Sequence, residues 1–305
     1  MKPYPTPQKS VIASAARQSM APGLPRCARN DGDGAPLITL DNLTVSYRHH
    51  PALHHISGQF ARGSLTAVMG PNGSGKSTLL KSIAGLLPIE GGRSGGALSM
   101  NTGERRIAYL PQLSEIDRGF PIDVRDCVLL GHWGSAGAFG GVSHDMLARV
   151  DAALHAVGLN GFERRAVGSL SAGQLQRVMF ARILVQDAQL ILLDEPFNAV
   201  DTKTTTGLLT LVRQWQQERR TVIAVLHDDA QVRQHFPQTL LLARELVGWG
   251  PTADVLTQAN LMRACAMAEA WDETAEVCDI DTALVQRVST SAHTHATRPV
   301  HPATT

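Results

Sequence analysis

The stretch from Gly70 to Thr78 has the sequence GPNGSGKST, which contains the residue types of a phosphate-binding loop. It follows the apolar segment SLTAVMG at 64–70 and leads into STLLKSIAGLL at 77–87, whose apolar residues recur at helical spacing. A strand, a glycine-rich loop and a helix in this order point successive backbone N–H groups and the positive end of the helix at one anion. We therefore predict that this loop holds the phosphates of a nucleotide.

Each residue type in the loop has an expected task. Glycines at 70, 73 and 75 let the backbone curl, Lys76 reaches the β- and γ-phosphates, and Ser77 offers a hydroxyl to Mg²⁺. A glycine-rich turn with a solvated lysine is the weaker alternative, because the strand and the helix stand on the correct sides. The residues expected to contact the nucleotide are Gly70, Pro71, Asn72, Gly73, Ser74, Gly75, Lys76, Ser77 and Thr78.

Two carboxylates end another apolar run, QLILLDEP at 189–196. Burial of an acid costs free energy unless the acid faces a metal or water, and a strand end beside a phosphate loop offers both. Asp194 is expected to hold Mg²⁺ directly or through water, and Glu195 to polarise the water that attacks the γ-phosphate. The alternative is a strand-end acid that only caps a helix.

His227 ends the next apolar run, TVIAVLH at 221–227, in the same position relative to its strand. A lone histidine there is more often structural than catalytic. One strand away from a phosphate site, however, it can donate to the γ-phosphate and sense its departure. Gln112 also follows a short apolar run, and on its own it indicates little.

The stretch VGSLSAGQLQRV at 167–178 places a serine and a glycine at the start of a helical pattern. Ser171 is a good helix cap, and Gly173 is unfavourable inside a helix. The local pattern therefore predicts a helix N-terminus.

The elements that must position these groups are strands. LITLDNLTVSY at 37–47 alternates in polarity, whereas the runs at 64–70, 189–196 and 221–229 are continuously apolar and of strand length. Such runs are typical of a parallel sheet buried on both faces, with functional groups at its carboxyl edge. The predicted fold class is α/β.

Composition and charge narrow the possible functions. The 305 residues carry a formal net charge of +1 and are 5% aromatic, so nothing favours a nucleic-acid partner. The cysteines are scattered without a C-x-x-C pair, which favours reduced thiols over disulfides or a zinc site; they are Cys27, Cys127, Cys265 and Cys278. No apolar run approaches the ~18 residues of a membrane span, and no secretory leader is evident, so work at a membrane would need another chain to cross it.

Both ends of the chain lack a sustained apolar pattern. Residues 1–36 are expected to be a disordered extension, within which Met20 is an alternative start to Met1. Residues 266–305 form a C-terminal segment whose part from about 281 is also expected to be disordered. The folded domain is predicted at 37–265.

Taken in order, the phosphate loop, Gln112, SLSAGQ at 169–174, LLDEP at 192–196 and His227 resemble the ATP-binding subunit of ABC transporters. The resemblance implies a P-loop NTPase with a RecA-like core, an N-terminal antiparallel β subdomain and a helical subdomain at about 113–175. It makes LSAGQ at 170–174 the signature motif, with Ala172 in place of the commoner glycine, and AVD at 199–201 the D-loop.

The resemblance also assigns roles to single residues. It implies ATPase activity with Glu195, His227 and Lys76 as catalytic residues, and Ser77, Gln112 and Asp194 around Mg²⁺. Two copies would pair head to tail, so that the signature motif of one copy completes the ATP site of the other. The further residues implied to contact ATP are Tyr47, which would stack on adenine, Gln112, Ser171, Gly173, Gln174 and Asp201.

Three further segments, at 115–134, 195–209 and 235–261, resemble the zinc and manganese uptake branch of the family. This implies a homodimer on a membrane permease at the cytoplasmic face of the inner membrane, supplied by an extracytoplasmic metal-binding protein. The alternatives are a ferric siderophore or haem importer, a soluble non-transport ATPase and a binding module without turnover. His132, Asp229 and the glycine-rich stretch at 134–141 depart from the pattern, and they leave the permease contact open.

Histidines form two further groups. One is in the C-terminal tail, and the other is expected to flank an exposed turn between strands. Either group could bind Zn²⁺ weakly, although a disordered tail and a solvated turn are the simpler interpretations. These residues are His293, His295 and His301 in the tail, and His49, His50, His54 and His55 near the turn.

Overall fold

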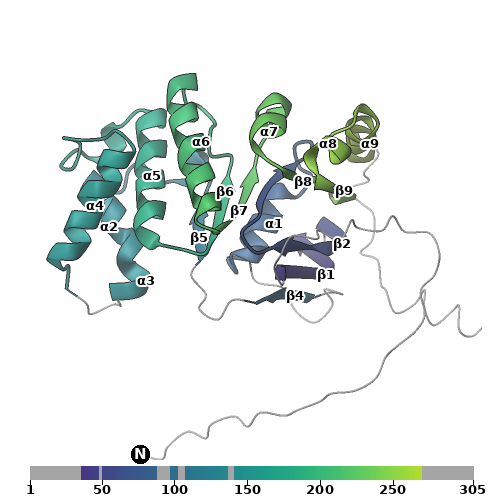
Figure 1. Ribbon diagram of the computed structural model, residues 1–305, viewed down its shortest axis with the longest axis horizontal. Helices are drawn as coiled ribbons and strands as arrows, with labels where there is room; N and C mark the ends of the chain where they lie inside the picture. The colour runs from purple at the N-terminus through teal and green to yellow at the C-terminus, as the bar shows by residue number, and fades with distance from the viewer. Residues whose placement is uncertain (1–35, 48–49, 88–96, 102–106, 137–140, 270–305) are drawn as a thin grey trace, which may run out of the picture.

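The computed structural model describes residues 36–47, 50–87, 97–101, 107–136 and 141–269 (Figure 1). The predictions for the N-terminal extension up to residue 35, for the tail from 281, and for Met20, Cys27, Cys278, His49 and the tail histidines lie outside these ranges. Pro36, which was expected to belong to the extension, is the first residue of a strand.

The central sheet has six strands in the order β5-β6-β7-β3-β8-β9. All neighbouring pairs are parallel except β8 and β9, which are antiparallel. The predicted parallel sheet is therefore confirmed, with one antiparallel edge strand added. The strands are β3 (Leu65–Met69), β5 (Ile107–Leu110), β6 (Leu190–Asp194), β7 (Thr221–Val225), β8 (Gln238–Ala243) and β9 (Glu245–Pro251).

Both faces of this sheet are covered, as the continuous apolar runs predict. Every residue of β3, β6 and β7 is buried, and successive residues along a strand enter different cores. Ile191 and Leu193 pack in a core with the larger helices, whereas Leu190 and Leu192 pack in a second core with α1 (Lys76–Ile83). This alternation is the two-residue period of a strand expressed in a sheet that has no solvent face.

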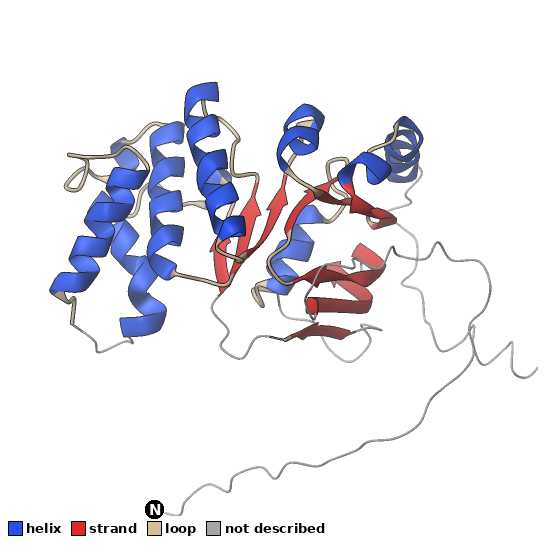
Figure 2. Cartoon of the chain, in the orientation of Figure 1, coloured by secondary structure: helices blue, strands red, loops and turns tan. Residues whose placement is uncertain are grey.

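A second sheet, of three antiparallel strands in the order β2-β1-β4, lies on the α1 side of the central sheet (Figure 2). Its strands are β1 (Pro36–Tyr47), β2 (His50–Ala61) and β4 (Ala97–Met100). The expected antiparallel subdomain is confirmed, and α1 lies between the two sheets (Figure 2).

The positions of two histidines in β2 differ from the prediction made for them. His54 and His55 do not flank an exposed turn but lie inside β2 with half-buried side chains. His54 Nδ1 lies 3.1 Å from Glu245 Oε1 in β9, and His55 Nδ1 lies 2.6 Å from Asn42 Oδ1 in β1. Strand β2 pairs with β1 in an irregular register and also packs against β9. No group of three or more metal-ligating side chains occurs among the described residues.

Helices pack at one end of the central sheet and along its other face (Figure 1). Helix α5 (Ala172–Gln186) starts in the region predicted as the helical subdomain but ends well beyond residue 175, so it reaches the core. The remaining helices lie beside it or against β7 and β8. They are α2 (Val124–Leu129), α3 (Trp133–Ala136), α4 (His144–Ala156), α6 (Thr202–Gln217), α7 (Asp229–His235), α8 (Thr252–Val255) and α9 (Gln258–Glu269), with 3-10 turns at Leu113–Glu115, Leu130–His132 and Val167–Ser169.

The two described cysteines are free thiols. Cys127 is buried, and burial raises the pKa of its thiol, while Cys265 is exposed. None of the helices in the described ranges is long and apolar enough to cross a membrane.

Candidate active site

The predicted phosphate loop connects β3 to α1. Gly75 caps α1 in the left-handed region at φ 90°, and Gly70 and Gly73 also have positive φ, at 147° and 76°. Only glycine adopts such angles without strain. The loop glycines therefore have the conformational role that the sequence predicts, and the first turn of α1 faces the loop.

Two neighbouring elements hold the loop closely. A Cβ on Gly70 would lie 1.9 Å from the carbonyl oxygen of Leu242 in β8, and a Cβ on Gly75 would lie 2.3 Å from that of Ala52 in β2. The backbone N–H of Arg244 donates to the carbonyl of Ser74 at 3.0 Å. The loop is thus fixed between the two sheets before it meets a ligand.

Substitution of these glycines by alanine separates backbone strain from close packing. Gly73→Ala meets no atom within 4 Å, so we expect a loss of about 1 kcal/mol in the free energy of unfolding from left-handed φ alone. Gly75→Ala adds the collision with Ala52, and we expect about 2 kcal/mol more. Denaturant unfolding of both variants measures the difference, and equal losses would contradict the packing argument.

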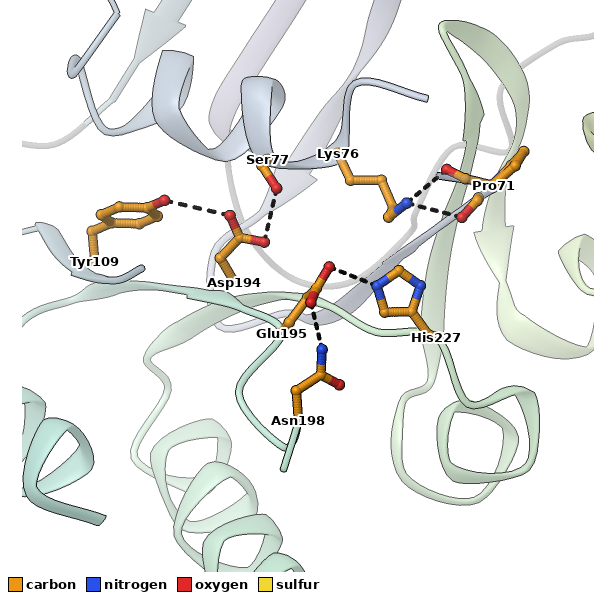
Figure 3. Close-up of polar contacts among 9 residues, drawn as sticks. Pro71, Lys76, Ser77, Tyr109, Asp194, Glu195, Asn198 and His227 are labelled. Carbon is orange, nitrogen blue, oxygen red and sulfur yellow. Dashed lines mark hydrogen bonds and ion pairs between the residues drawn. The ribbon is translucent and has the colours of Figure 1, made fainter. Parts of the chain in front are cut away.

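Lys76 is buried at the end of this loop. Its ammonium donates to the carbonyl oxygens of Gly70 at 2.9 Å and Pro71 at 2.8 Å (Figure 3). Burial lowers its pKa, and the carboxylates of Glu195 and Asp194 oppose that shift. An ammonium has three N–H donors, and these two bonds leave one for a further anion.

Asp194, the last residue of β6, is fully buried beside the loop. Its Oδ1 accepts from the hydroxyl of Ser77 at 3.1 Å, and its Oδ2 from that of Tyr109 at 3.4 Å (Figure 3). Burial raises the pKa of this carboxyl, although the Ser77 bond opposes the shift. A buried carboxylate paired with a hydroxyl is the hard oxygen donor set that suits Mg²⁺, so these residues fit the predicted ion.

Glu195 follows directly, and two side chains hold its carboxylate. His227 Nε2 lies 2.7 Å from Oε1, and the amide of Asn198 donates to Oε2 (Figure 3). A cavity of about 340 Å³ opens beside these three residues and gives room for water next to the carboxylate. The strand-end acid and the strand-end histidine predicted from separate runs therefore meet, because β6 and β7 are parallel neighbours.

The signature stretch forms the predicted helix start. Ser171 caps α5 through a reciprocal pair with Gln174: Gln174 N–H donates to Ser171 Oγ at 3.2 Å, and Ser171 N–H donates to Gln174 Oε1 at 3.0 Å. This pairing is a capping box. Within the part of the chain that the structure describes, no hydrogen bond joins Ser171 or Gln174 to the phosphate loop, and Gly173 lies near Ala199.

Three other predicted residues are placed by the elements to which they belong. Gln112 follows β5 and precedes a 3-10 turn, and in the described ranges no hydrogen bond links its side chain to Ser77 or Asp194. Asp201 caps α6, and its bonds from the N–H and hydroxyl of Thr204, at 3.0 and 2.7 Å, lower the pKa of its carboxyl. Tyr47 ends β1.

Sequence reasoning missed three side chains. Asn198 binds Glu195 within one turn, Tyr109 reaches Asp194 from β5, and Gln176 of α5 donates to the carbonyl of Pro196 at 2.6 Å. The spacing of Asn198, three residues after Glu195, is a turn signal that could have identified it. No local signal identifies the other two.

Comparison with known proteins shows the family to which the chain belongs. The family described as ABC transporter matches residues 53–198. The zinc transport system ATP-binding protein TroB of Treponema pallidum (strain Nichols) is 39% identical over 230 residues, covering 74% of this chain and 86% of its own length. The chain belongs to the ABC transporter family, among its ATP-binding proteins. The manganese transport system ATP-binding protein MntB of Bacillus subtilis (strain 168) is 38% identical over 231 residues, covering 74% and 91%.

Solved structures of family members share the fold. A structure described as a metal-chelate type ABC transporter in an inward-facing conformation gives a TM-score of 0.66 at 28% identity, covering 76% of this chain and 90% of the other. A nucleotide-free ATP-binding cassette from an ABC transporter gives 0.65 at 19% identity, covering 76% and 99%. The ABC transporter resemblance predicted from the ordered motifs is confirmed, as is the fold class.

Proposed function

We propose that this chain is the ATP-hydrolysing subunit of an ABC importer that powers uptake of a divalent transition metal, zinc or manganese. The observation that carries the enzymatic part is the Glu195–His227 pair, joined at 2.7 Å beside Lys76 and the Ser77–Asp194 pair. The names of the relatives TroB and MntB support the choice of metal. Within the chain, 37–265 is proposed as the ATP-binding domain and 113–175 as its helical subdomain.

In this proposal the loop and Lys76 bind the phosphates of ATP. The backbone N–H groups and the dipole of α1 attract the negative charge, and the ammonium of Lys76 turns its remaining donor toward the β- and γ-phosphates. Ser77 and Asp194 would hold Mg²⁺, which neutralises phosphate charge when bound. The raised pKa of Asp194 reflects the cost of its charge in a buried position, and a cation there lowers that cost.

Glu195 and His227 would act on the attacking water and on the γ-phosphate. Water attacks the γ-phosphorus, the bond to the β–γ bridging oxygen breaks, and the proton of the water passes to Oε1 of Glu195. His227 Nε2 lies 2.7 Å from the same oxygen, which still has a lone pair for that proton. When Nε2 carries a proton, the γ-phosphate offers it a further acceptor.

The functional unit in this proposal is a homodimer on a membrane permease. Ser171, Gly173 and Gln174 of one copy would face the γ-phosphate bound by the other, with Asp201 of the D-loop at the same interface, Tyr47 against adenine and Gln112 near Mg²⁺. The complex would lie at the cytoplasmic face of the inner membrane and receive metal from an extracytoplasmic binding protein. A soluble non-transport ATPase is the alternative class.

Metal uptake in a strain lacking this chain tests the transport proposal. We expect uptake of radioactive zinc or manganese to fall to background, and to return with the wild-type chain but not with Glu195→Gln. The Glu195→Gln chain is the matched control, because it tests whether transport needs hydrolysis. Loss of iron uptake alone would favour a siderophore or haem importer, and unchanged uptake of all three metals would favour the soluble class.

A further inference from the structure

Gln176 is a buried polar residue in the second turn of α5. Its side chain is 1% exposed, and its amide Nε2 donates to the carbonyl oxygen of Pro196 at 2.6 Å. Pro196 directly follows Glu195 in the chain. This hydrogen bond therefore attaches α5, the helix that begins within the signature motif, to the segment that carries the proposed general base.

The oxygen of the same amide indicates why a polar residue occupies this position. Gln176 Oε1 is buried and has no hydrogen-bond partner among the described residues. A methionine fills nearly the same volume without leaving a polar atom unpaired. Since packing alone would favour an apolar side chain, the N–H donor is the property of Gln176 that this position uses.

The segment that Gln176 contacts is strained. Glu195 and Ala199 both have left-handed φ, at 50° and 57°, although neither is a glycine. Such residues persist only where their surroundings hold them in place. Inside the turn, the backbone N–H of Asn198 donates to the carbonyl of Glu195 at 3.3 Å, and the Asn198 amide donates to the Glu195 carboxylate. The Gln176 bond supports this turn from outside.

The first turn of α5 runs along the same segment at a second point. A Cβ on Gly173 would lie 3.9 Å from the carbonyl oxygen of Ala199. Gln176 and Gly173 are three residues apart and therefore on one face of the helix. The turn Glu195–Ala199 is thus held to α5 by a hydrogen bond near its start, and its end passes close to the first turn of the helix.

We propose that Gln176 is a positioning residue, which ties the turn Glu195–Ala199 to α5 so that the position of this helix sets the position of the Glu195 carboxylate. The inference rests on the proposed function, in which Ser171 at the start of α5 contacts the nucleotide of the partner copy. One rigid helix then joins the contact with one ATP to the general base that acts on the other. The two sites of a dimer are linked through each subunit by a single side chain.

Two substitutions test the bond. Gln176→Met keeps the volume and removes the donor, so we expect kcat for ATP hydrolysis to fall on the order of tenfold while KM and the affinity of the monomer for ATP stay unchanged. Gln176→Glu keeps the shape, and its protonated form still donates an O–H to Pro196. Once ionised, it repels that carbonyl, so the ratio of its kcat to the wild-type kcat is expected to decline as pH rises. Burial raises the pKa of such a carboxyl and brings this decline into the assay range.

Gln186→Met is the matched control. Gln186 is the last residue of the same helix, and its amide oxygen is also buried without a hydrogen bond in the described ranges, but it lies far along α5 from Pro196. We expect its kcat to equal that of the wild type. Thermal unfolding of all three variants checks that each is folded at the assay temperature.

Other results would overturn the inference. The inference fails if Gln176→Met has the wild-type kcat, or if its loss of activity appears in KM instead. It also fails if Gln186→Met loses as much activity as Gln176→Met. A ratio of the Gln176→Glu kcat to the wild-type kcat that does not change with pH would equally refute it. If Gln176→Glu fails to fold, the comparison between the two methionine variants decides alone. Glu195→Gln, assayed in parallel, separates the two proposals: hydrolysis by that variant would refute the general base, whereas its inactivity beside unaffected Gln176 variants refutes only the positioning role.

Discussion

Glu195→Gln is expected to bind ATP with wild-type affinity and to hydrolyse it about 10²- to 10⁴-fold more slowly. Glutamine has the size of glutamate, so its side chain can still meet His227 and Asn198, but it cannot take a proton from water. The phosphate loop, Lys76 and the Ser77–Asp194 pair stay intact. Steady-state phosphate release and equilibrium binding of ATP measure the two properties separately.

The same variant tests whether ATP joins two copies. Since hydrolysis would normally separate the dimer, a chain that binds ATP without consuming it should accumulate as an ATP-bound dimer in light scattering. Lys76→Met is the matched control, because the substituted side chain is similar in length but lacks the charge that meets the phosphates, and we expect it to stay monomeric. A Glu195→Gln chain that binds ATP and remains a monomer would contradict the dimer proposal.

The core of the site was predictable because its residues are local to strand ends. A continuously apolar run of strand length predicts a strand buried on both faces, and the residue after it lies at the carboxyl edge of the sheet. Asp194 and His227 were found in this way, and the parallel pairing of β6 and β7 brings the two edges together. Their expected roles in ATP hydrolysis come from the nearby phosphate loop and from the family resemblance, not from the strand pattern alone.

The contacts that hold polar side chains in place were only partly predictable, because they depend on unusual backbone angles or on partners far away in the sequence. The spacing marks a turn at Asn198, but the contact of its amide with Glu195 also depends on the left-handed backbone of Glu195, which the spacing does not show. His54 in β2 meets Glu245 in β9 across 191 residues of sequence, because the two strands pack together in the fold, and a periodic pattern does not encode that packing. Sequence patterns identify which groups do the chemistry, whereas the packing of elements decides what holds them.

Ser171→Arg is expected to abolish hydrolysis while the monomer still binds ATP. Ser171 caps α5, and no hydrogen bond within the described ranges joins it to the phosphate loop of its own chain. In the head-to-tail dimer it would approach the γ-phosphate held by the partner, and the bulk of arginine would block that approach. The lost cap costs only about 1 kcal/mol of stability, so the chain should remain folded. Equal loss of hydrolysis and of monomer binding would contradict the assignment.

A mixed dimer makes the same test decisive. In a dimer of one Ser171→Arg chain and one Lys76→Met chain, carrying different affinity tags, one site receives both substitutions and the other receives neither. If Ser171 acts on the partner's ATP, this dimer regains hydrolysis that neither parent homodimer has. If Ser171 acts on its own ATP, each site carries one substitution and the mixed dimer stays inactive.

Coupling between the two sites could silence the mixed dimer for another reason, and a binding measurement removes that ambiguity. With Glu195→Gln added to both chains, nucleotide is retained rather than consumed. The trans arrangement then predicts an ATP-dependent mixed dimer that traps one ATP in its intact site, because Lys76 comes from one chain and Ser171 from the other. In the cis arrangement each ATP site carries one of the two substitutions, Ser171→Arg or Lys76→Met. This arrangement therefore predicts no ATP-dependent mixed dimer. The stoichiometry of trapped ATP therefore shows which molecule's phosphate the helix start at Ser171 contacts.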